Sequence, residues 1–296
     1  MSSTPSAADS SAVRVVHRID ELRRCIQGWR QAGQRISYVP TMGSLHAGHL
    51  SLVEAARAHG DRVVVSIFVN PLQFSAGEDL DKYPRTLEAD CAKLASCGVD
   101  LVFAPEEAEV YPYGRANLTQ VAVPGLSSLL CGEYRAGHFE GVTTVVSLLF
   151  NLVQPDCAVF GLKDYQQLTI IRRMVRDLHV PVEIVGMPTL REPGGLAMSS
   201  RNIYLSADER AQAEVIYASL CEAADALRAG HRDIAALEAR GCHRIDQAGL
   251  KTQFFQVRQA DLEAPDDATQ QFVVLAAAKL GGTRLIDNVT VDLNLA

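Results

Sequence analysis

Two histidines, His46 and His49, lie three positions apart in a glycine-containing segment that directly follows the apolar run Ile36–Val39. Where a helix begins, residues three apart share one face, and exposed backbone N–H groups favour a phosphate. Two imidazoles on one face can donate hydrogen bonds to phosphate oxygens as charge develops there. A pair of incidental turn histidines is the alternative, and metal binding is disfavoured because no third ligand is apparent. The position after the first predicted strand favours a phosphate site.

Two further polar groups follow predicted strands. Gln73 comes shortly after the apolar run Val63–Val69 and an Asn70-Pro71 turn. Its amide can donate to and accept from a small polar substrate, although a loop amide that faces solvent is the alternative. Lys163 and Asp164 follow Ala158–Phe160, where the next helix should begin.

The Lys163-Asp164 pair predicts a contact with an anion. A lysine at a helix start opposes the helix dipole, and an anionic partner removes that objection. Asp164 is a residue type that caps helices, which is its structural role in this interpretation. Gln167 lies three positions beyond Asp164 and should face the same side.

Two loops add charged and hydroxyl groups. The segment Arg135-Ala-Gly-His138 precedes a predicted helix. It could order a lid or touch a phosphate, and it could equally cap the helix and fix a loop. The segment Met198-Ser-Ser-Arg201 suits a mobile loop that closes over a triphosphate, with Arg201 neutralising charge.

The elements that must position these residues alternate between strand and helix. The predicted strands are rich in Val, Ile and Phe, as strands buried on both faces should be: Ile36–Val39, Val63–Val69, Val99–Phe103, Ala158–Phe160 and Val182–Val185. The predicted helices lie between them: His49–Ala58, Leu87–Ser96, Val142–Leu152 and Tyr165–Leu178. This alternation predicts an α/β fold with a doubly wound, mostly parallel sheet, whose ligands bind at the carboxyl ends of the strands.

The pattern changes near residue 189. A capping box at Ser206–Glu209 predicts a long helix to about Ala229, and a second helix should span Asp233–Ala248. Strand-like runs follow at Phe254–Val257, Phe272–Ala277 and Arg284–Val291. We therefore expect a tail at residues 1–12, a main domain at 13–188 and a smaller α+β domain at 189–296.

Composition narrows the class of protein. The 296 residues carry a formal net charge of −7, which argues against broad attraction to nucleic acid or to an anionic membrane surface. Seven cysteines are scattered with no Cys-x-x-Cys pair, a pattern typical of core-filling residues in a reducing compartment. The first twelve residues are small and polar, which indicates a disordered tail rather than a signal peptide. We expect a cytoplasmic protein.

Taken together, five segments resemble the motifs of the pantoate–β-alanine ligase (pantothenate synthetase) family, in order. They are Pro40-Thr-Met-Gly…His46-x-Gly-His49, Phe68-Val-Asn-Pro-x-Gln73-Phe, Gly137-His-Phe, Gly161-x-Lys-Asp-Tyr-Gln-Gln167 and Met198-Ser-Ser-Arg-Asn202. The resemblance implies a Rossmann-like domain with a smaller C-terminal domain, as in a wider nucleotidyltransferase superfamily. It also implies that ATP and pantoate, with Mg²⁺, give pantoyl adenylate and pyrophosphate. The amine of β-alanine then displaces AMP. A homodimer through the N-terminal domain is the implied assembly.

The resemblance also implies roles for individual residues. His49 would be the proton donor, and His46, Lys163 and Arg201 would offset charge. Gln73 and Gln167 would hold pantoate, with Gln73 also near β-alanine. No protein ligand to a metal is implied. The ATP-contacting residues would be Met42, Gly43, Ser44, Leu45, His46, Ala47, Gly48, His49, Gly161, Leu162, Lys163, Asp164, Leu190, Met198, Ser199, Ser200 and Arg201.

The chain departs from the common family pattern at Ser44, Ala47, Leu162 and Pro193-Gly194, none of which removes a proposed anchoring side chain. Three alternatives remain. A nucleotidyltransferase that acts on a phosphorylated acceptor predicts basic residues around the acceptor, whereas the two glutamines suit a polyol. A class I aminoacyl-tRNA synthetase fragment conflicts with the negative net charge of the chain and with the lack of room for an RNA-binding domain. A non-catalytic nucleotide-binding module conflicts with the retention of Lys163, Asp164 and Arg201.

Overall fold

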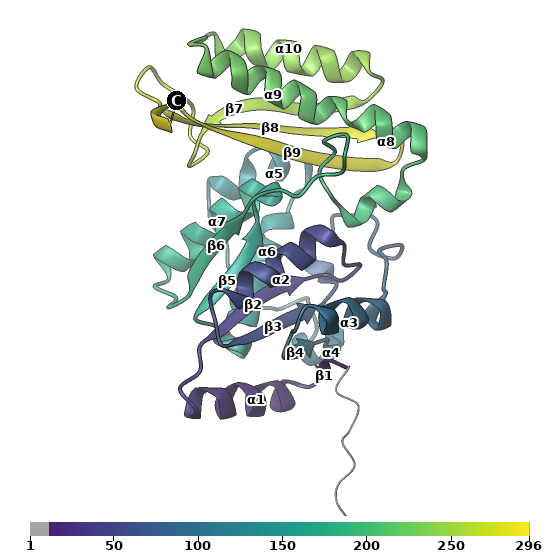
Figure 1. The fold of residues 1–296 in the computed structure, drawn as a ribbon, viewed down its shortest axis with the longest axis vertical. Helices are drawn as coiled ribbons and strands as arrows, with labels where there is room; N and C mark the ends of the chain where they lie inside the picture. Colours follow the sequence, from purple (N-terminus) through teal and green to yellow (C-terminus); the bar gives the residue numbers. More distant parts are fainter. Residues whose placement is uncertain (1–11, 296) are drawn as a thin grey trace, which may run out of the picture.

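The computed structural model describes residues 12–295, and it contains two β-sheets (Figure 1). The larger sheet has six parallel strands in the order β1-β4-β3-β2-β5-β6, and the smaller has three antiparallel strands in the order β7-β8-β9. The predicted α/β fold with a smaller α+β part is confirmed. The predicted tail falls outside the described residues, apart from Ala12. Among the helices of residues 12–295, none has the length and apolar character needed to cross a membrane.

The parallel strands are buried on both faces, as their nearly continuous apolar sequences require. On β2, Tyr38 packs with one core cluster and its neighbour Val39 packs with another, and both side chains are fully buried. The strands span β1 Arg14–Val16, β2 Ile36–Thr41, β3 Arg62–Ile67, β4 Leu101–Phe103, β5 Cys157–Gly161 and β6 Glu183–Met187.

Helices cover both faces of this sheet. Buried residues of α1, α6 and α7 share the cluster that contains Tyr38, and those of α2 and α3 share the cluster that contains Val39. The helices of this part are α1 Ile19–Gln31, α2 Ala47–Arg57, α3 Leu87–Ser96, α4 Glu107–Val110, α5 Cys131–Tyr134, α6 His138–Val153 and α7 Tyr165–Asp177, with short 3₁₀ turns η1 Pro71–Gln73, η2 Leu126–Ser128 and η3 Leu162–Asp164.

The sequence patterns missed β1 and α1. The strand β1 has only three residues and lies at the edge of the sheet, and α1 buries only Leu22, Cys25 and Ile26. Both signals are weak because each element contributes little apolar surface to the core. The histidine segment consequently follows the second strand of the chain and not the first.

The strand order places a topological switch point between β2 and β5. From β2 the chain proceeds outward to β3 and β4, whereas β5 returns to the other side of β2 and leads to β6. Ligands of open parallel sheets bind beyond the carboxyl ends of the strands at such a point. The segments that leave β2 and β5 there contain His46 and Lys163.

The C-terminal part begins after β6. The predicted capping box is confirmed, since Ser206 Oγ accepts from Glu209 N at 3.2 Å and Glu209 Oε2 accepts from Ser206 N at 2.9 Å. The prediction of a single long helix was wrong. The segment forms two helices that meet at Glu214, whose N–H donates to Ala211 O three residues back. The elements here are η4 Ser200–Tyr204, α8 Ala207–Ala213, α9 Val215–Arg228, α10 Ile234–Gln247, β7 Lys251–Gln259, β8 Gln271–Leu280, β9 Thr283–Asp292 and η5 Leu293–Leu295.

The central strand β8 contributes side chains to two apolar clusters, one on each of its faces. Phe272, Val274 and Ala276 pack toward α9 and α10, whereas Val273 and Leu275 belong to the cluster of the parallel sheet. Alternate side chains of a strand point to opposite faces, so β8 is buried on both. The C-terminal sheet is therefore seated on the parallel domain through its apolar face, beneath α9 and α10 in Figure 1.

Candidate active site

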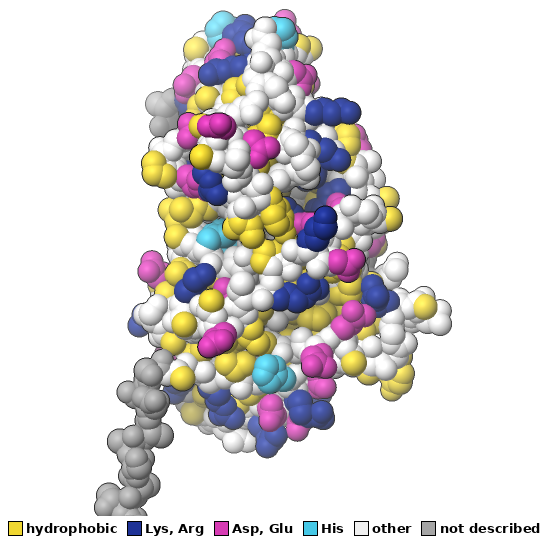
Figure 2. All heavy atoms as spheres, turned by 90° about the vertical axis from the view of Figure 1, so that its right-hand side faces the viewer, with side chains coloured by type: hydrophobic (Ala, Val, Ile, Leu, Met, Phe, Trp, Pro, Cys, Tyr) yellow, Lys and Arg dark blue, Asp and Glu magenta, His cyan; other side chains and the backbone are white. Residues whose placement is uncertain are grey.

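A cleft of about 840 Å³ lies at the carboxyl ends of β2 and β5 and extends to the C-terminal sheet. On the molecular face shown in Figure 2, Lys and Arg side chains are interspersed with Asp and Glu side chains. The cleft gathers most of the predicted site residues, namely Met42, His46, Gly48, His49, Gln73, Gly161, Lys163, Asp164, Gln167, Leu190, Met198, Ser199, Ser200 and Arg201. Five predicted residues do not line it: Gly43, Ser44, Leu45, Ala47 and Leu162.

The turn Gly43–Leu45 shapes the cleft from behind. Gly43 has φ +81°, and a side chain there would meet Ile67 Cγ2 at 3.0 Å. The Asp90 carboxylate of α3 accepts from Ser44 N and Leu45 N, each at 2.8 Å. These contacts fix the backbone from which His46 projects, so this turn positions the site without forming its wall.

The two histidines confirm the predicted helix-start geometry and constrain each other. His46 is the N-cap of α2, and its Nδ1 accepts from Gly48 N at 3.1 Å. His49 Nδ1 accepts from His46 N at 3.3 Å. A side chain at Gly48 would lie 2.9 Å from His46 Cε1, so glycine permits this packing. Because backbone N–H groups can only donate, each Nδ1 is an acceptor and each Nε2 must be the donor when the ring is neutral.

Both rings are neutral at pH 7. Burial, followed by the charge of Lys163, lowers the pKa of His46 to about 4. Burial and then neighbouring His46 lower the pKa of His49 to about 3. The ring centroids are 4.1 Å apart, so a charge on one ring would repel a charge on the other. The free site therefore offers two neutral Nε2–H donors.

The lowered pKa values predict acid destabilisation. Unfolding restores the ordinary histidine pKa of 6.5. As the pH falls below that value, the unfolded chain therefore binds protons that the native state does not, which lowers the free energy of unfolding. Thermal unfolding should therefore show a lower Tm at about pH 5.5 than at about pH 7.5. His49→Gln should reduce that difference, and His231→Gln, which changes an exposed ring, should not. An equal pH dependence in His49→Gln would contradict the burial argument.

Gln73 is held from several sides. Its Oε1 accepts from Asn70 Nδ2 at 3.1 Å, and its Nε2 lies 3.1 Å from Met42 Sδ. Asn70 is buried, and its Oδ1 accepts a hydrogen bond from Tyr111 Oη at 2.8 Å. The turn predicted at Asn70-Pro71 thus also orients Gln73, which lies in the cleft rather than facing solvent.

The Arg135–His138 segment fixes the loop that follows Gln73. Arg135 pairs with Glu78 through Nε–Oε1 at 2.6 Å and Nη2–Oε2 at 2.7 Å. Since Arg135 Nη1 donates to His138 Nε2 at 2.9 Å, the other ring nitrogen, Nδ1, donates to Gln73 O at 2.7 Å. Of the alternatives left open by the sequence, the structure favours loop fixation, although both residues also line the cleft.

Lys163 and Asp164 end the turn η3 beside the histidines. The expectation that Asp164 caps the next helix is wrong in one respect: it occupies the N-cap position of α7, but its side chain makes no capping hydrogen bond. Its carboxylate is directed to the cleft instead. Within residues 12–295, the Lys163 ammonium has no carboxylate partner within 4.0 Å, unlike Arg135 and Arg201.

Arg201 already has an anionic partner. Its Nε and Nη2 donate to the two oxygens of Asp79, both at 2.9 Å. Ser200 Oγ donates to Ser44 O at 3.0 Å, which ties this loop to the turn behind the histidines. The loop is therefore closed onto the parallel domain in this structure, and Asp79 offsets the positive charge of Arg201.

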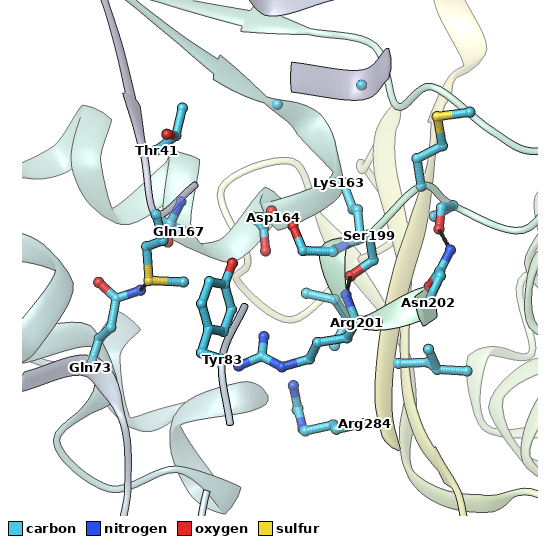
Figure 3. A pocket seen from close by; sticks show the side chains of 18 of the residues that line it. Thr41, Gln73, Tyr83, Lys163, Asp164, Gln167, Ser199, Arg201, Asn202 and Arg284 are labelled. Carbon is cyan, nitrogen blue, oxygen red and sulfur yellow. Dashed lines mark hydrogen bonds between the residues drawn. The ribbon is translucent and has the colours of Figure 1, made fainter. Parts of the chain in front are cut away.

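Figure 3 shows how these side chains are distributed, with Gln73, Gln167 and Thr41 on one side and Lys163, Ser199 and Arg201 on the other. Asp164 and Tyr83 lie between the two groups in this view. The arrangement offers uncharged donors and acceptors at one end and cations at the other. It suits a small polyol acid beside a polyphosphate.

Comparison with known proteins fits this arrangement. The model of the pantoate-beta-alanine ligase family matches residues 14–290. The chain belongs to this family. The pantothenate synthetase of Stutzerimonas stutzeri (strain A1501) is 56% identical over 282 residues, which cover 95% of this chain and 99% of that protein. The corresponding protein of Pseudomonas fluorescens (strain SBW25) is 54% identical over 95% of this chain and 100% of its own length.

Solved structures of pantoate–β-alanine ligases share the fold. The crystal structure of pantothenate synthetase from Thermus thermophilus is 45% identical, with a TM-score of 0.87 over 94% of this chain and 99% of that chain. A pantoate–β-alanine ligase from Francisella tularensis, complexed with β-γ ATP and β-alanine, is 34% identical, with a TM-score of 0.78 over 94% and 97% of the two chains.

Sequence reasoning missed several residues of this ligase site. Tyr83 and Arg284 line the cleft from a loop and from β9, and Asp79 and Asp90 hold Arg201 and the histidine turn. Asp79 and Tyr83 follow shortly after the Gln73 motif but lie in a loop with no recognisable pattern, whereas Arg284 is distant along the chain from every motif. One signal existed for Asp90: it precedes Leu94 by one helical turn, which places a carboxylate on the buried face of α3.

One possible metal-binding group occurs among the described residues, and it lies away from the cleft. Atoms of His59, Cys157 and Glu183 come within 4.8 Å of one another. Cys157 and Glu183 begin β5 and β6, so the group is at the opposite edge of the sheet from the histidines. Arg35 lies 3.7 Å from Glu183, where its cation competes with a metal ion.

Proposed function

We propose that this chain condenses pantoate with β-alanine at the expense of ATP, through pantoyl adenylate. The observation that carries the proposal is the convergence, in one cleft, of two neutral Nε2–H donors, two glutamines and a lysine that no carboxylate of residues 12–295 pairs with. Family membership supports the substrates, and the complex of the Francisella relative with a nucleotide and β-alanine supports the two-substrate site.

In the first step a pantoate carboxylate oxygen attacks the α-phosphorus of ATP, and the bond to the departing pyrophosphate breaks. Two anions must approach, so donors and cations have to offset their repulsion. His46 and His49 supply Nε2–H donors at the start of α2, and Lys163 supplies a positive charge on the wall of the cleft. This role is positioning and electrostatic stabilisation, without a covalent enzyme intermediate.

His49 acts as a hydrogen-bond donor in this proposal rather than as a strong acid. A ring whose pKa is about 3 carries no extra proton to give at pH 7. A neutral imidazole at a helix start can still polarise an oxygen through its N–H, and incoming phosphate charge would raise the pKa of the ring.

The glutamines hold the acid. Gln73 and Gln167 line the same side of the cleft, and each amide can both donate and accept. Pantoate brings hydroxyls and a carboxylate, which suit such partners. In the second step the β-alanine amine attacks the acyl carbon, AMP leaves, and the amine loses a proton as the amide forms.

Mg²⁺ is the cofactor we assign to the first step. It would be bound mainly by ATP phosphates and water. Asp164 is the protein group that fits it, because its carboxylate makes no capping hydrogen bond to α7 and lines the cleft. When bound, it would neutralise phosphate charge and help the pyrophosphate leave.

The free cysteines and the family resemblance support a cellular location and an assembly for this protein. Seven cysteines are free in the structure, which suits a reducing compartment and supports a cytoplasmic location. The resemblance supports a homodimer through the N-terminal domain, with no nucleic acid or membrane partner. ATP, pantoate and β-alanine are the small-molecule partners.

Pyrophosphate exchange into ATP tests the assignment. With the purified chain, Mg²⁺, ATP and labelled pyrophosphate, exchange should require pantoate and should not require β-alanine, because the adenylate forms reversibly before the amine enters. A panel of other carboxylates provides the control. Exchange that proceeds equally without pantoate would refute the substrate, and exchange dependent on a phosphorylated acceptor would favour the related nucleotidyltransferase.

A further inference from the structure

Asn288 on β9 reaches from the C-terminal sheet to the backbone that carries Lys163. Its Nδ2 donates to Leu162 O at 2.8 Å and to Lys163 O at 2.9 Å, and the residue is buried. An amide nitrogen has two N–H bonds, so both are used by the turn η3. A side chain of the smaller domain thus holds two successive carbonyl groups of the turn that ends at Lys163 and Asp164.

Asn288 is itself fixed by an ion pair between Arg191 and the buried side chain of Asp287. Arg191 Nη1 lies 2.5 Å from Asp287 Oδ2 and Nη2 lies 3.0 Å from Oδ1, while Nη2 also donates to Asn288 O at 3.2 Å. Asp287 Oδ1 accepts from Asn288 N at 2.8 Å. The Arg191 guanidinium stacks 3.6 Å from the centre of the Tyr217 ring. The amide therefore has little freedom to swing away from η3.

The sheet that carries Asn288 is itself packed into the apolar core. The neighbouring strand β8 is buried on both faces, and its apolar residues join the core of the parallel domain. A change in the seating of β9 would therefore move the carbonyls of η3, and with them the ammonium of Lys163 and the carboxylate of Asp164.

We propose that Asn288 is a positioning residue for adenylate formation, which holds Lys163 and Asp164 at the phosphates of ATP, with the Arg191–Asp287 pair holding Asn288 in turn. This inference rests on the proposed function, because it assigns Lys163 to the ATP step. It gives the C-terminal sheet a part in the chemistry: β9 sets the position of a group that the parallel domain contributes.

Two variants of Asn288 test the proposal in the full-length protein. Asn288→Ala removes both donors, and Asn288→Asp keeps the shape but presents a carboxylate that cannot donate to carbonyl oxygens. Pantoate-dependent pyrophosphate exchange should fall by roughly 10-fold to 100-fold in both, with the Asp variant at least as impaired. Amide formation from added pantoyl adenylate should change by less than about 3-fold, because Lys163 has no phosphate transfer to assist there. Thr290→Ala, an exposed change on the same strand, is the matched control.

A double variant separates positioning from general structural support. In a Lys163→Ala background, Asn288→Ala should cost exchange much less than it does alone, since residues that act through one another are not additive. Additive losses, or equal losses in both half-reactions, would overturn the proposal, as would normal exchange in both single variants. Absence of exchange in the unmodified protein, or normal exchange in Lys163→Ala, would instead refute the proposed function.

Discussion

Replacing His49 by alanine should lower pantoate-dependent pyrophosphate exchange by roughly 100-fold to 1000-fold, the usual cost of removing one preorganised donor from a developing charge. The structure gives this donor its geometry: His49 Nδ1 accepts from His46 N, which commits Nε2–H to the cleft. The loss should appear in the exchange rate with saturating ATP and pantoate, because it acts on the step in which pyrophosphate leaves.

Two controls make the His49 result specific. His59→Ala removes a histidine just beyond the other end of α2 and should leave exchange within about 2-fold of normal, as surface changes away from such a site usually do. Added pantoyl adenylate should restore amide formation in His49→Ala if the ring serves only the first step. Near-normal exchange in His49→Ala would remove the histidine pair from the mechanism.

The sequence predicted the parallel fold and the edge of the sheet where chemistry occurs, because both depend on local patterns. Continuous Val- and Ile-rich runs are typical of buried parallel strands, and the polar residues directly after them must meet at one edge. For this reason sequence patterns alone single out His46, Gln73 and Lys163 as candidate site residues, although they leave a loop role open for Gln73. All three line one cleft.

The contacts that hold those residues were not predictable in the same way. Asp90 and Asn288 lie in a helix and a strand that are distant in sequence from the backbone they bind. Their partners are main-chain groups, which carry no residue type and so leave no mark in the sequence. Likewise, the sequence indicates no partner for the Arg201 cation, and its ion pair with Asp79 becomes visible only in the folded structure.

Asp90 provides the second large effect that we expect. Its two oxygens accept from Ser44 N and Leu45 N, and Thr86 Oγ1 donates to Oδ2 at 3.0 Å. One turn later on α3, Lys93 Nζ donates to Leu45 O at 2.6 Å. Two side chains of α3 therefore hydrogen-bond to the N–H and to the carbonyl of Leu45, the residue directly before His46.

Asp90→Ala should destabilise the protein by about 2–4 kcal/mol, because it leaves two backbone donors behind the site without an acceptor. Asp90→Asn should be nearly as harmful despite its matched shape, since its NH₂ group would face a backbone N–H and not an acceptor. Thermal unfolding measures this, with Glu88→Ala as the control: Glu88 is an exposed acid in the same helix turn, whose loss should cost under about 1 kcal/mol.

The same variants distinguish a site that is held in place from one that forms by itself. If α3 holds the turn, Asp90→Asn should lower exchange by at least roughly 10-fold at a temperature where the protein remains folded, because an N-cap histidine that shifts by about 1 Å misdirects both donors. If the reciprocal contacts of His46, Gly48 and His49 are sufficient alone, stability should fall while exchange in the folded protein stays normal. The two outcomes separate because the histidines bond to each other locally, whereas Asp90 reaches them only through the tertiary fold.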